Sequence, residues 1–297
     1  MKALVKGSLS LVGRVLRHTP LARSKFLNDL QAEVALRFHN SNTATMGPFR
    51  IQFSPSDRVI AKKLVLYGEY DKAQIELLCS YIKPGDDVLD IGANIGLYSV
   101  YLSRAVGPEG RVLAVEPDPR NLELLKVNLE ANNCDNVYIA PLCLGTEDGE
   151  VKLFRVTGNA GGSSLWSQGQ DESSDTVPMR IGDDVVSELG FRPSVAKIDV
   201  EGAEPLVLAG LRKNRPGVVL FEYFSDAIEG LGQNAQEFLE SLVADGYSLA
   251  AVDPHSGAVQ AGSVEDVVSL MEVSPSGGVY GNMLAIHQDS PAGQAQD

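Results

Sequence analysis

The sequence of 297 residues predicts an α/β fold in which helices cover both faces of a mostly parallel β-sheet. From about residue 70 onward, strand-like and helix-like patterns alternate, which is typical of this class. Most strand-like runs are continuously apolar, as in parallel strands that are buried on both faces. No repeat or linker divides the chain, so we expect one domain at 57–288, a basic, partly helical extension at 1–56 and a disordered tail at 289–297.

The first half of the alternation has clear helix-start signals. Asp71 is a candidate N-cap of the first helix, and Asp118 followed by Pro119 marks the start of another. In order, we expect a helix at 71–82, a strand at 88–92, a helix at 97–106, a strand at 111–116, a helix at 118–132 and a strand at 136–142.

The second half begins with a less regular region. Residues 149–156 are predicted to form an inserted or edge strand, and residues 158–176, rich in Gly, Ser and Asp, a surface loop. The alternation then resumes with a helix at 183–189, a strand at 194–199, a helix at 204–213, a strand at 217–224, a helix at 235–246 and final strands at 247–253 and 281–287.

Composition excludes several classes of partner. The net charge is −14, and the first 28 residues contain six basic residues and no acid, so the body of the chain should repel nucleic acid. No apolar run is long enough to span a membrane or mark secretion, which makes the cytoplasm the default location. The basic N-terminal segment has apolar residues at helical spacing. We favour a helix packed on the domain over weak contact with anionic membrane or a transit peptide.

A glycine-containing loop joins the first strand to its helix, with Asp90, Gly92, Asn94 and Gly96 in sequence. Ligands of open α/β sheets bind at this edge, where glycines allow backbone amides to approach a ligand closely. Glu116 ends the next strand, where a carboxylate can accept hydrogen bonds from both ribose hydroxyls. These parts together predict a ligand that contains adenosine.

The spacing of the loop also discriminates between ligands. Dinucleotide folds use GxGxxG, whereas this loop reads GxNxG and follows an acid. An acid at that place would repel a pyrophosphate but attract an ammonium or a sulfonium cation. S-adenosyl-L-methionine has both cations, so we expect it as cofactor and disfavour a nicotinamide-dependent oxidoreductase.

Charges interrupt the apolar pattern at the strand 194–199. Strand periodicity puts Lys197 and Asp199 on one face, and Asp199 and Glu201 should emerge at the edge that carries the glycine loop. Glu222 joins them if the next strand pairs alongside. We expect Asp199 or Glu201 to orient or deprotonate an acceptor. Lys197 could tune these acids through an ion pair or act as base if its pKa is lowered, and a structural ion pair with Glu222 is equally consistent.

Two neighbouring features receive simpler interpretations. Glu204 lies in the first turn of a helix, where the helix dipole favours a carboxylate. A divalent metal between Asp199, Glu201 and Glu222 is chemically feasible, but the acids lack the fixed spacing of a metal-binding loop, so we assign no metal site.

Five blocks of the chain resemble the FkbM family of S-adenosylmethionine-dependent methyltransferases. They are DDVLDIGANIGLYSVYLS, AVEPDPRNLELLKVNL, GGSSL, VAKIDVEGAEPLVLAGL and VVLFEY, and the resemblance covers residues 57–287. It implies a Rossmann-like class I methyltransferase fold, with a seven-stranded sheet and an antiparallel last strand. It further implies that the loop residues Asp90, Gly92, Asn94 and Gly96 hold the methionine part and ribose, and Glu116 the ribose hydroxyls.

The resemblance also implies O-methylation of a hydroxyl on a small polar acceptor, such as a sugar or a glycosylated metabolite. Residues 161–165 would then form part of the acceptor wall. The chain departs from the family at Thr146, where an acid is frequent, so we expect Leu144 and its neighbours to sandwich the adenine ring. The competing hypothesis is a non-catalytic module that binds an adenosine ligand, or an interaction protein. The acids beside the loop favour the enzyme.

Overall fold

The computed structural model describes residues 41–54, 57–156, 159–167 and 172–294. The predicted N-terminal helix and its membrane contact therefore lie outside the described residues. Among the helices within these ranges, none combines the length and the apolar composition needed to cross a lipid bilayer.

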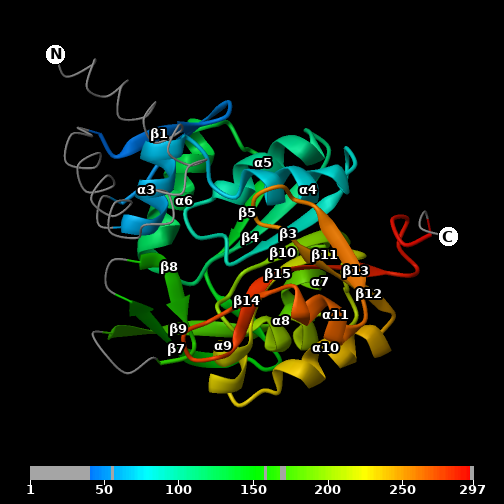
Figure 1. Ribbon diagram of the computed structural model, residues 1–297. Helices are drawn as coiled ribbons and strands as arrows, with labels where there is room; N and C mark the ends of the chain where they lie inside the picture. Colours follow the sequence, from blue (N-terminus) through cyan, green and yellow to red (C-terminus); the bar gives the residue numbers. More distant parts are fainter. Residues whose placement is uncertain (1–40, 55–56, 157–158, 168–171, 295–297) are drawn as a thin grey trace.

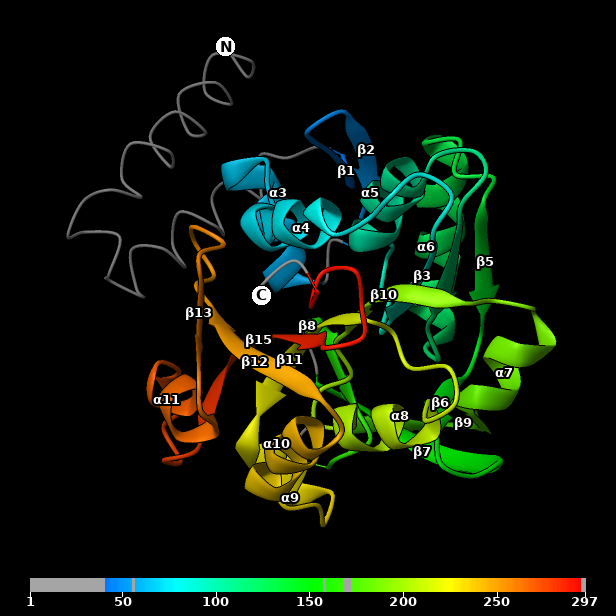
Figure 2. The ribbon, with the colours of Figure 1, turned by 90° about the vertical axis from the view of Figure 1, so that its right-hand side faces the viewer.

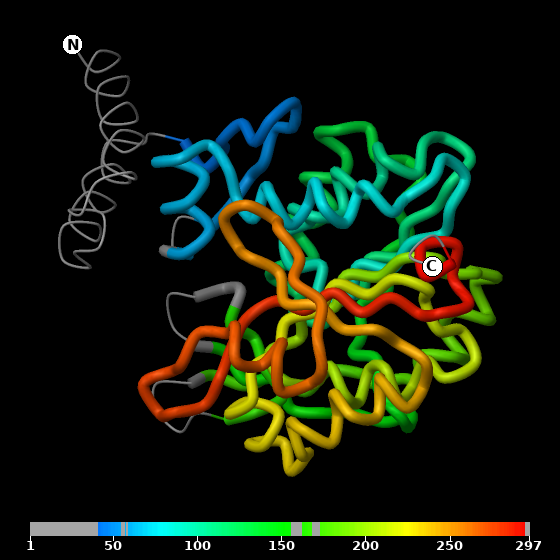
Figure 3. Tube along the Cα trace, turned by 45° about the vertical axis from the view of Figure 1, so that its right-hand side comes forward, coloured from blue at the N-terminus to red at the C-terminus, as the bar shows by residue number. Residues whose placement is uncertain are grey.

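A mostly parallel sheet organises the described part of the chain (Figure 1). Its strands are β3 (Asp87–Ile91), β4 (Arg111–Val115), β5 (Val137–Ala140), β10 (Pro193–Ile198), β11 (Val218–Phe224), β12 (Tyr247–Val252), β13 (Val259–Gly262), β14 (Glu272–Val273) and β15 (Val279–His287). The order is β13-β12-β15-β11-β10-β3-β4-β5, with β14 paired to β15. The last strand, β15, is antiparallel to both β11 and β12, and its red trace crosses the middle of the molecule (Figure 3). The predicted fold class is confirmed, with β13 and β14 as short additions.

Helices cover both faces of this sheet (Figure 2). Alternate strand residues face opposite sides, so Val195 packs in one core layer and Ala196 in the other. The first layer lies under α3 (Arg58–Tyr67), α4 (Lys72–Ser80), α5 (Leu97–Val106) and α6 (Pro119–Ala131). The second lies under α7 (Gly182–Glu188), α8 (Glu204–Gly210), α9 (Ser225–Gly230), α10 (Ala235–Ala244) and α11 (Val264–Ser269).

Asp118 and Asp71 stand at the N-cap positions of α6 and α4, but only Asp118 makes a capping hydrogen bond. Asp118 caps α6 by accepting a hydrogen bond from the Arg120 amide, as predicted, and Pro119 occupies the first turn. Asp71 stands at the N-cap position of α4 without a capping hydrogen bond. The predicted N-cap position is confirmed, but the Asp71 carboxylate pairs with Lys63 at 3.1 Å instead of capping the helix.

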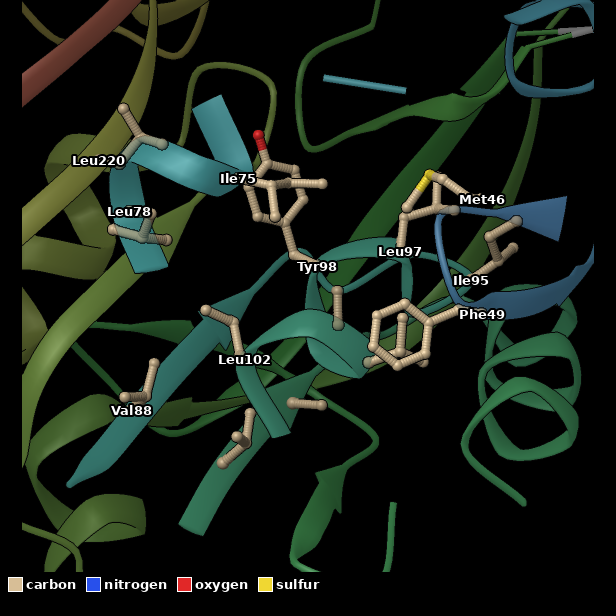
Figure 4. Packing of buried hydrophobic residues seen from close by; sticks show 14 of the residues in the cluster. Met46, Phe49, Ile75, Leu78, Val88, Ile95, Leu97, Tyr98, Leu102 and Leu220 are labelled. Carbon is tan, nitrogen blue, oxygen red and sulfur yellow. The ribbon is translucent and has the colours of Figure 1, made fainter. Parts of the chain in front are cut away.

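A small hairpin, β1 (Thr43–Met46) and β2 (Phe49–Gln52), packs against the first helix layer. Figure 4 shows Met46 and Phe49 beside Leu97 and Ile95. The Asn128 side chain of α6 exchanges hydrogen bonds with the backbone of Gln52, at 2.6 and 2.9 Å. The described residues of the predicted extension 1–56 thus include a hairpin that belongs to the domain core.

A second, four-stranded sheet is inserted after β5, and we call it the accessory sheet. It consists of β6 (Cys143–Gly145), β7 (Gly149–Val156), β8 (Asn159–Ser164) and β9 (Glu172–Ile181), in the order β6-β9-β7-β8. The predicted strand 149–156 is confirmed. The predicted loop 158–176 is wrong, because β8 and the start of β9 pair on either side of β7. The exposed, polar outer residues of β9 conceal that pairing in the sequence.

The end of the described chain is folded onto the domain. Ser290 is buried, its hydroxyl donates to the His287 carbonyl at 2.6 Å, and Ala292 packs against the first core layer. Residues 289–294 therefore depart from the predicted disordered tail, because these local hydrogen bonds hold them in turns. Residues 295–297 lie outside the described ranges.

The contact between α8 and β6 provides a test of the packing. A Cβ atom at Gly210 would lie 2.0 Å from the carbonyl oxygen of Gly145. We expect Gly210→Ala to lower the free energy of unfolding by about 1 to 3 kcal/mol, because backbone cannot yield as a flexible side chain can. Urea unfolding would measure the change. The control is Gly149→Ala, since an added Cβ there has no atom within 4 Å; equal midpoints for both variants would disprove the close contact.

Candidate functional site

The glycine loop between β3 and α5 packs directly against the end of β10. Gly92 has φ +79°, and a Cβ there would lie 1.8 Å from the Asp199 carbonyl oxygen. Glycine is thus required twice over at this position, by the backbone angle and by the approach of β10. The Gly92 amide donates to the Val115 carbonyl at 2.9 Å. The loop therefore joins the ends of three neighbouring parallel strands, β10, β3 and β4.

Glu116 follows β4 and is 4% exposed. Two backbone amides fix its carboxylate: the Asn94 amide donates to Oε2 and the Asp118 amide to Oε1, both at 2.8 Å. The Asn121 side chain makes a longer contact with Oε1, at 3.4 Å. Because a carboxylate has about four lone-pair sites, acceptor capacity remains on the carboxylate after these bonds.

A cavity with about 560 Å³ of space, mouth included, opens beside Glu116, and we call it the cofactor cavity. The predicted residues Gly92, Asn94, Glu116 and Leu144 all line it. The accessory sheet adds Leu153, Ser163 and Leu165, so the segment 161–165, expected at the acceptor wall, instead contributes to the wall of the cofactor cavity.

Two of the predicted cofactor residues line neither described cavity. Gly96 turns the chain into α5 with φ +87°, and a Cβ there would lie 2.7 Å from Leu125. Asp90 is 1% exposed and accepts a hydrogen bond from the Ser99 hydroxyl at 2.5 Å. Burial raises the Asp90 pKa to about 6, although Ser99 and Lys197 oppose that rise. Gly96 and Asp90 therefore stabilise the loop and do not face a ligand.

A second cavity adjoins the first, and we call it the acceptor cleft. It holds about 1400 Å³ of space, including its open mouth. The two cavities share Gly92, Asn94 and Asp199 in their walls. Glu201 and Glu222 also line the cleft, together with apolar and aromatic residues that include Ile60, Tyr70, Leu97, Met271 and Tyr280.

The structure brings together all four residues that the sequence proposes for chemistry. Strands β10 and β11 are parallel neighbours, so the acids at their ends meet at one edge. Carboxylate oxygens of Asp199, Glu201 and Glu222 lie within 4.8 Å of one another. Lys197 is 2% exposed, and its Nζ is 3.0 Å from the Asp199 carboxylate. Three carboxylates at this spacing could also bind a divalent cation.

Burial and mutual repulsion shift the proton affinities of the acid cluster. Burial, with help from Asp199 and Glu204, raises the Glu201 pKa to about 8. The pKa of Glu222 is well above its ordinary value, first because of burial and then because of Asp199 and Glu201. Burial lowers the pKa of Lys197, but the attraction and hydrogen bond to Asp199, together with the charges of Glu222 and Asp71, outweigh burial and leave that pKa raised. Lys197 therefore stays charged, and the ion-pair interpretation is preferred to that of a base.

Glu201 has a left-handed backbone, with φ +54°, in the turn that follows β10. Gly202 continues the turn at φ +103°. The buried Glu204 carboxylate accepts hydrogen bonds from the Val200 and Gly202 amides at 2.9 Å, so Glu204 closes this turn besides starting α8. The Ser164 hydroxyl donates to the Glu201 carbonyl at 2.9 Å, a contact that the sequence pattern did not indicate. Non-glycine residues with a strained, left-handed backbone, such as Glu201, are frequent at functional sites.

The fold and the two adjoining cavities define the class of protein, a class I methyltransferase architecture with a ligand site at the carboxyl edge of its sheet. The Methyltransferase FkbM domain matches residues 90–249, which is just over half of the chain. The chain belongs to the FkbM methyltransferase family.

Two similar proteins are themselves named methyltransferases. Methyltransferase 1 of Beauveria bassiana (strain ARSEF 2860) is 28% identical over 156 residues, which are 45% of this chain and 62% of that protein. Methyltransferase sdnD of Sordaria araneosa is 31% identical over 115 residues, 38% of this chain and 43% of that protein. The match thus spans less than two thirds of either relative. The crystal structure of Methyltransferase FkbM from Methylobacillus flagellatus KT aligns over 80% of this chain and 56% of that one, with 15% identity and a TM-score of 0.42.

The raised pKa of Glu201 should make stability depend on pH. An acid whose pKa is higher in the folded state takes up a proton on folding, so the free energy of unfolding should decrease as pH rises from about 5 to about 8. We expect Glu201→Gln to reduce this decrease, as measured by urea unfolding at several pH values. The control is Glu272→Gln, an exposed acid of the same cleft. Parallel pH curves for wild type and Glu201→Gln would contradict the assignment.

Proposed function

We propose that this protein is an S-adenosylmethionine-dependent O-methyltransferase that acts on a hydroxyl of a small polar acceptor, such as a sugar or a glycosylated metabolite. The observation that carries the proposal is the shared wall of the two cavities, formed by Gly92, Asn94 and Asp199. A methyl donor held in the cofactor cavity would meet an acceptor at this wall, with the acid cluster beside both.

The residues around the cofactor cavity fit S-adenosylmethionine. Asn94 Oδ1 is buried and has no hydrogen-bond partner among the described residues, so an acceptor is free for a ligand donor such as an ammonium group. Glu116 retains acceptor capacity for ribose hydroxyls, and Leu144 and Leu153 offer apolar contact to an adenine ring. When bound, the cofactor supplies a methyl group on a sulfonium sulfur, which departs as a neutral thioether, a good leaving group.

Glu201 is our candidate for the proton acceptor. Its pKa of about 8 is close to neutral, where a general base combines a useful ionised fraction with a strong pull on the proton. Asp199 is held by the Lys197 ammonium and is suited to orient the acceptor hydroxyl. The raised pKa of Glu222 favours its protonated form, which can donate a hydrogen bond to another oxygen of the acceptor.

The composition of the acceptor cleft favours a polyhydroxylated acceptor. Carboxylates accept hydrogen bonds from hydroxyls, and the tyrosines Tyr70 and Tyr280 have flat apolar faces. Ile60 and Met271 add apolar surface. This mixture is complementary to a sugar ring, which is polar around its edge and less polar on its faces.

Calorimetric titration tests the cofactor assignment. We expect S-adenosylmethionine and S-adenosylhomocysteine to bind and NAD to bind far more weakly. The affinity for S-adenosylmethionine should fall as pH decreases below about 7, because burial raises the Glu116 pKa to about 7. The protonated carboxyl group accepts fewer hydrogen bonds from the ribose hydroxyls. Glu116→Gln should weaken binding about tenfold or more and lose this pH dependence. The matched control is Glu123→Gln on the exposed side of α6; no binding of either sulfur compound would refute the assignment.

Turnover measurements test the role of Glu201. The acceptor can be found by incubating the protein with labelled S-adenosylmethionine and a cell extract. Glu201→Gln should then reduce kcat by about 10²-fold to 10⁴-fold while S-adenosylhomocysteine affinity stays near that of the wild type. The control Glu265→Gln, an exposed acid of α11 that lines neither cavity, should keep normal kcat. Unchanged turnover in Glu201→Gln would rule out this residue as the base.

A further inference from the structure

Arg155, on strand β7 of the accessory sheet, is a buried arginine outside the roles described so far. It is 6% exposed. Its guanidinium forms a fork with Asp118, with Nε 2.5 Å from Oδ2 and Nη2 3.1 Å from Oδ1. The remaining nitrogen, Nη1, pairs with Asp175 of β9 at 2.5 Å. A bidentate fork fixes orientation as well as charge, which a lysine could not reproduce.

Asp118 connects this arginine to the cofactor cavity. The carboxylate of Asp118 is 2% exposed and also contacts the Ser163 hydroxyl of β8 at 3.4 Å. The backbone amide of Asp118 donates to Glu116. Burial alone raises the Asp118 pKa, but the hydrogen bonds from Arg155 and Arg120 outweigh burial and hold that pKa below its ordinary value. The residue therefore stays ionised between the accessory sheet and the loop that carries Glu116.

Arg155 also lies behind the wall of the cavity. Leu153, two residues earlier on the same strand, shares its face of β7 and lines the cofactor cavity. Ser163 and Leu165 line the same wall. The fork to Asp118 is thus the buried ion pair that ties this wall to the central sheet at the position of Glu116.

We propose that Arg155 is a positioning residue for the cofactor: by clamping Asp118, it holds the accessory sheet against the cofactor cavity and fixes the loop that orients Glu116. This inference rests on the proposed function, because its ligand is the adenosine part of S-adenosylmethionine. Arg155 itself does not line the cavity, so its effect is transmitted through Asp118 and through its neighbours on the accessory sheet.

The first test is the affinity of S-adenosylhomocysteine, measured by calorimetry without any acceptor. Arg155→Met keeps an apolar stem but loses the fork, and its dissociation constant should rise about 10-fold to 100-fold, because small displacements of positioning groups have effects of this size. Arg155→Lys should lie between it and the wild type. The matched control is Arg180→Met on β9, which loses a similar fork to Glu188 at the surface and should bind normally.

A double variant separates positioning from general stability. Removing Arg155 alone leaves a buried, uncompensated carboxylate, which destabilises the fold. Adding Asp118→Asn removes that charge while asparagine still caps α6 and keeps its backbone amide. In Arg155→Met with Asp118→Asn, the free energy of unfolding should recover towards the wild type while ligand affinity stays low. Recovery of both together would overturn the positioning role.

The single tryptophan of the chain provides a spectroscopic readout. Trp166 follows Leu165 of the cavity wall, its amide donates to Ser164, and its ring packs against Gly230 and Phe224. We expect Arg155→Met, but not Arg180→Met, to change the emission of Trp166 in the ligand-free protein. Absence of ligand binding by the wild type would overturn the proposed function and this inference with it. Normal binding by the wild type and by Arg155→Met would overturn the inference alone.

Discussion

The buried ammonium of Lys197 is the charge on which the acid cluster depends. Parallel pairing puts Lys197 beside Asp90 on one neighbouring strand and next to β11, which carries Glu222 at its end, on the other. Without this cation, three carboxylates within 4.8 Å would face only one another in a partly buried cleft. Their combined field keeps Lys197 protonated in return. The register of three strands therefore decides both which acids meet and which of them hold protons.

The second constraint is the junction between two sheets. The central sheet provides the glycine loop and Glu116, and the accessory sheet closes the opposite wall of the cofactor cavity. The two meet where Arg155 reaches Asp118 and where Ser164 reaches the Glu201 carbonyl. One strand pair of the accessory sheet thus contacts both the cofactor side and the acid side of the site. A ligand that displaces this strand pair would therefore change the geometry of both sides of the site.

The sequence predicts the central sheet and most of the site because charges stand out within apolar runs. Glu116, and Lys197 with its acids, interrupt buried strands, and the alternation of elements brings those strand ends to one edge. The accessory sheet is predicted only at β7, because the strand residues within 158–176 are mostly small and polar and pair with β7 rather than with each other. Arg155 lies on the predicted strand 149–156, but the sequence pattern does not indicate its contact with Asp118, 37 residues earlier in the chain. Asp90 is in the predicted motif, but sequence spacing does not tell which side of the loop its side chain occupies.

The left-handed backbone of Glu201 lowers the stability of the fold at the same residue that we propose as the base. A non-glycine residue with φ +54° carries strain of about 1 to 3 kcal/mol, held here by the Glu204 and Ser164 hydrogen bonds. Glycine or asparagine would relax that turn, and either would remove the carboxylate. Selection for thermal stability alone would thus tend to remove the candidate base, whereas stabilising changes made on the hairpin β1–β2 or on α10 would leave it in place.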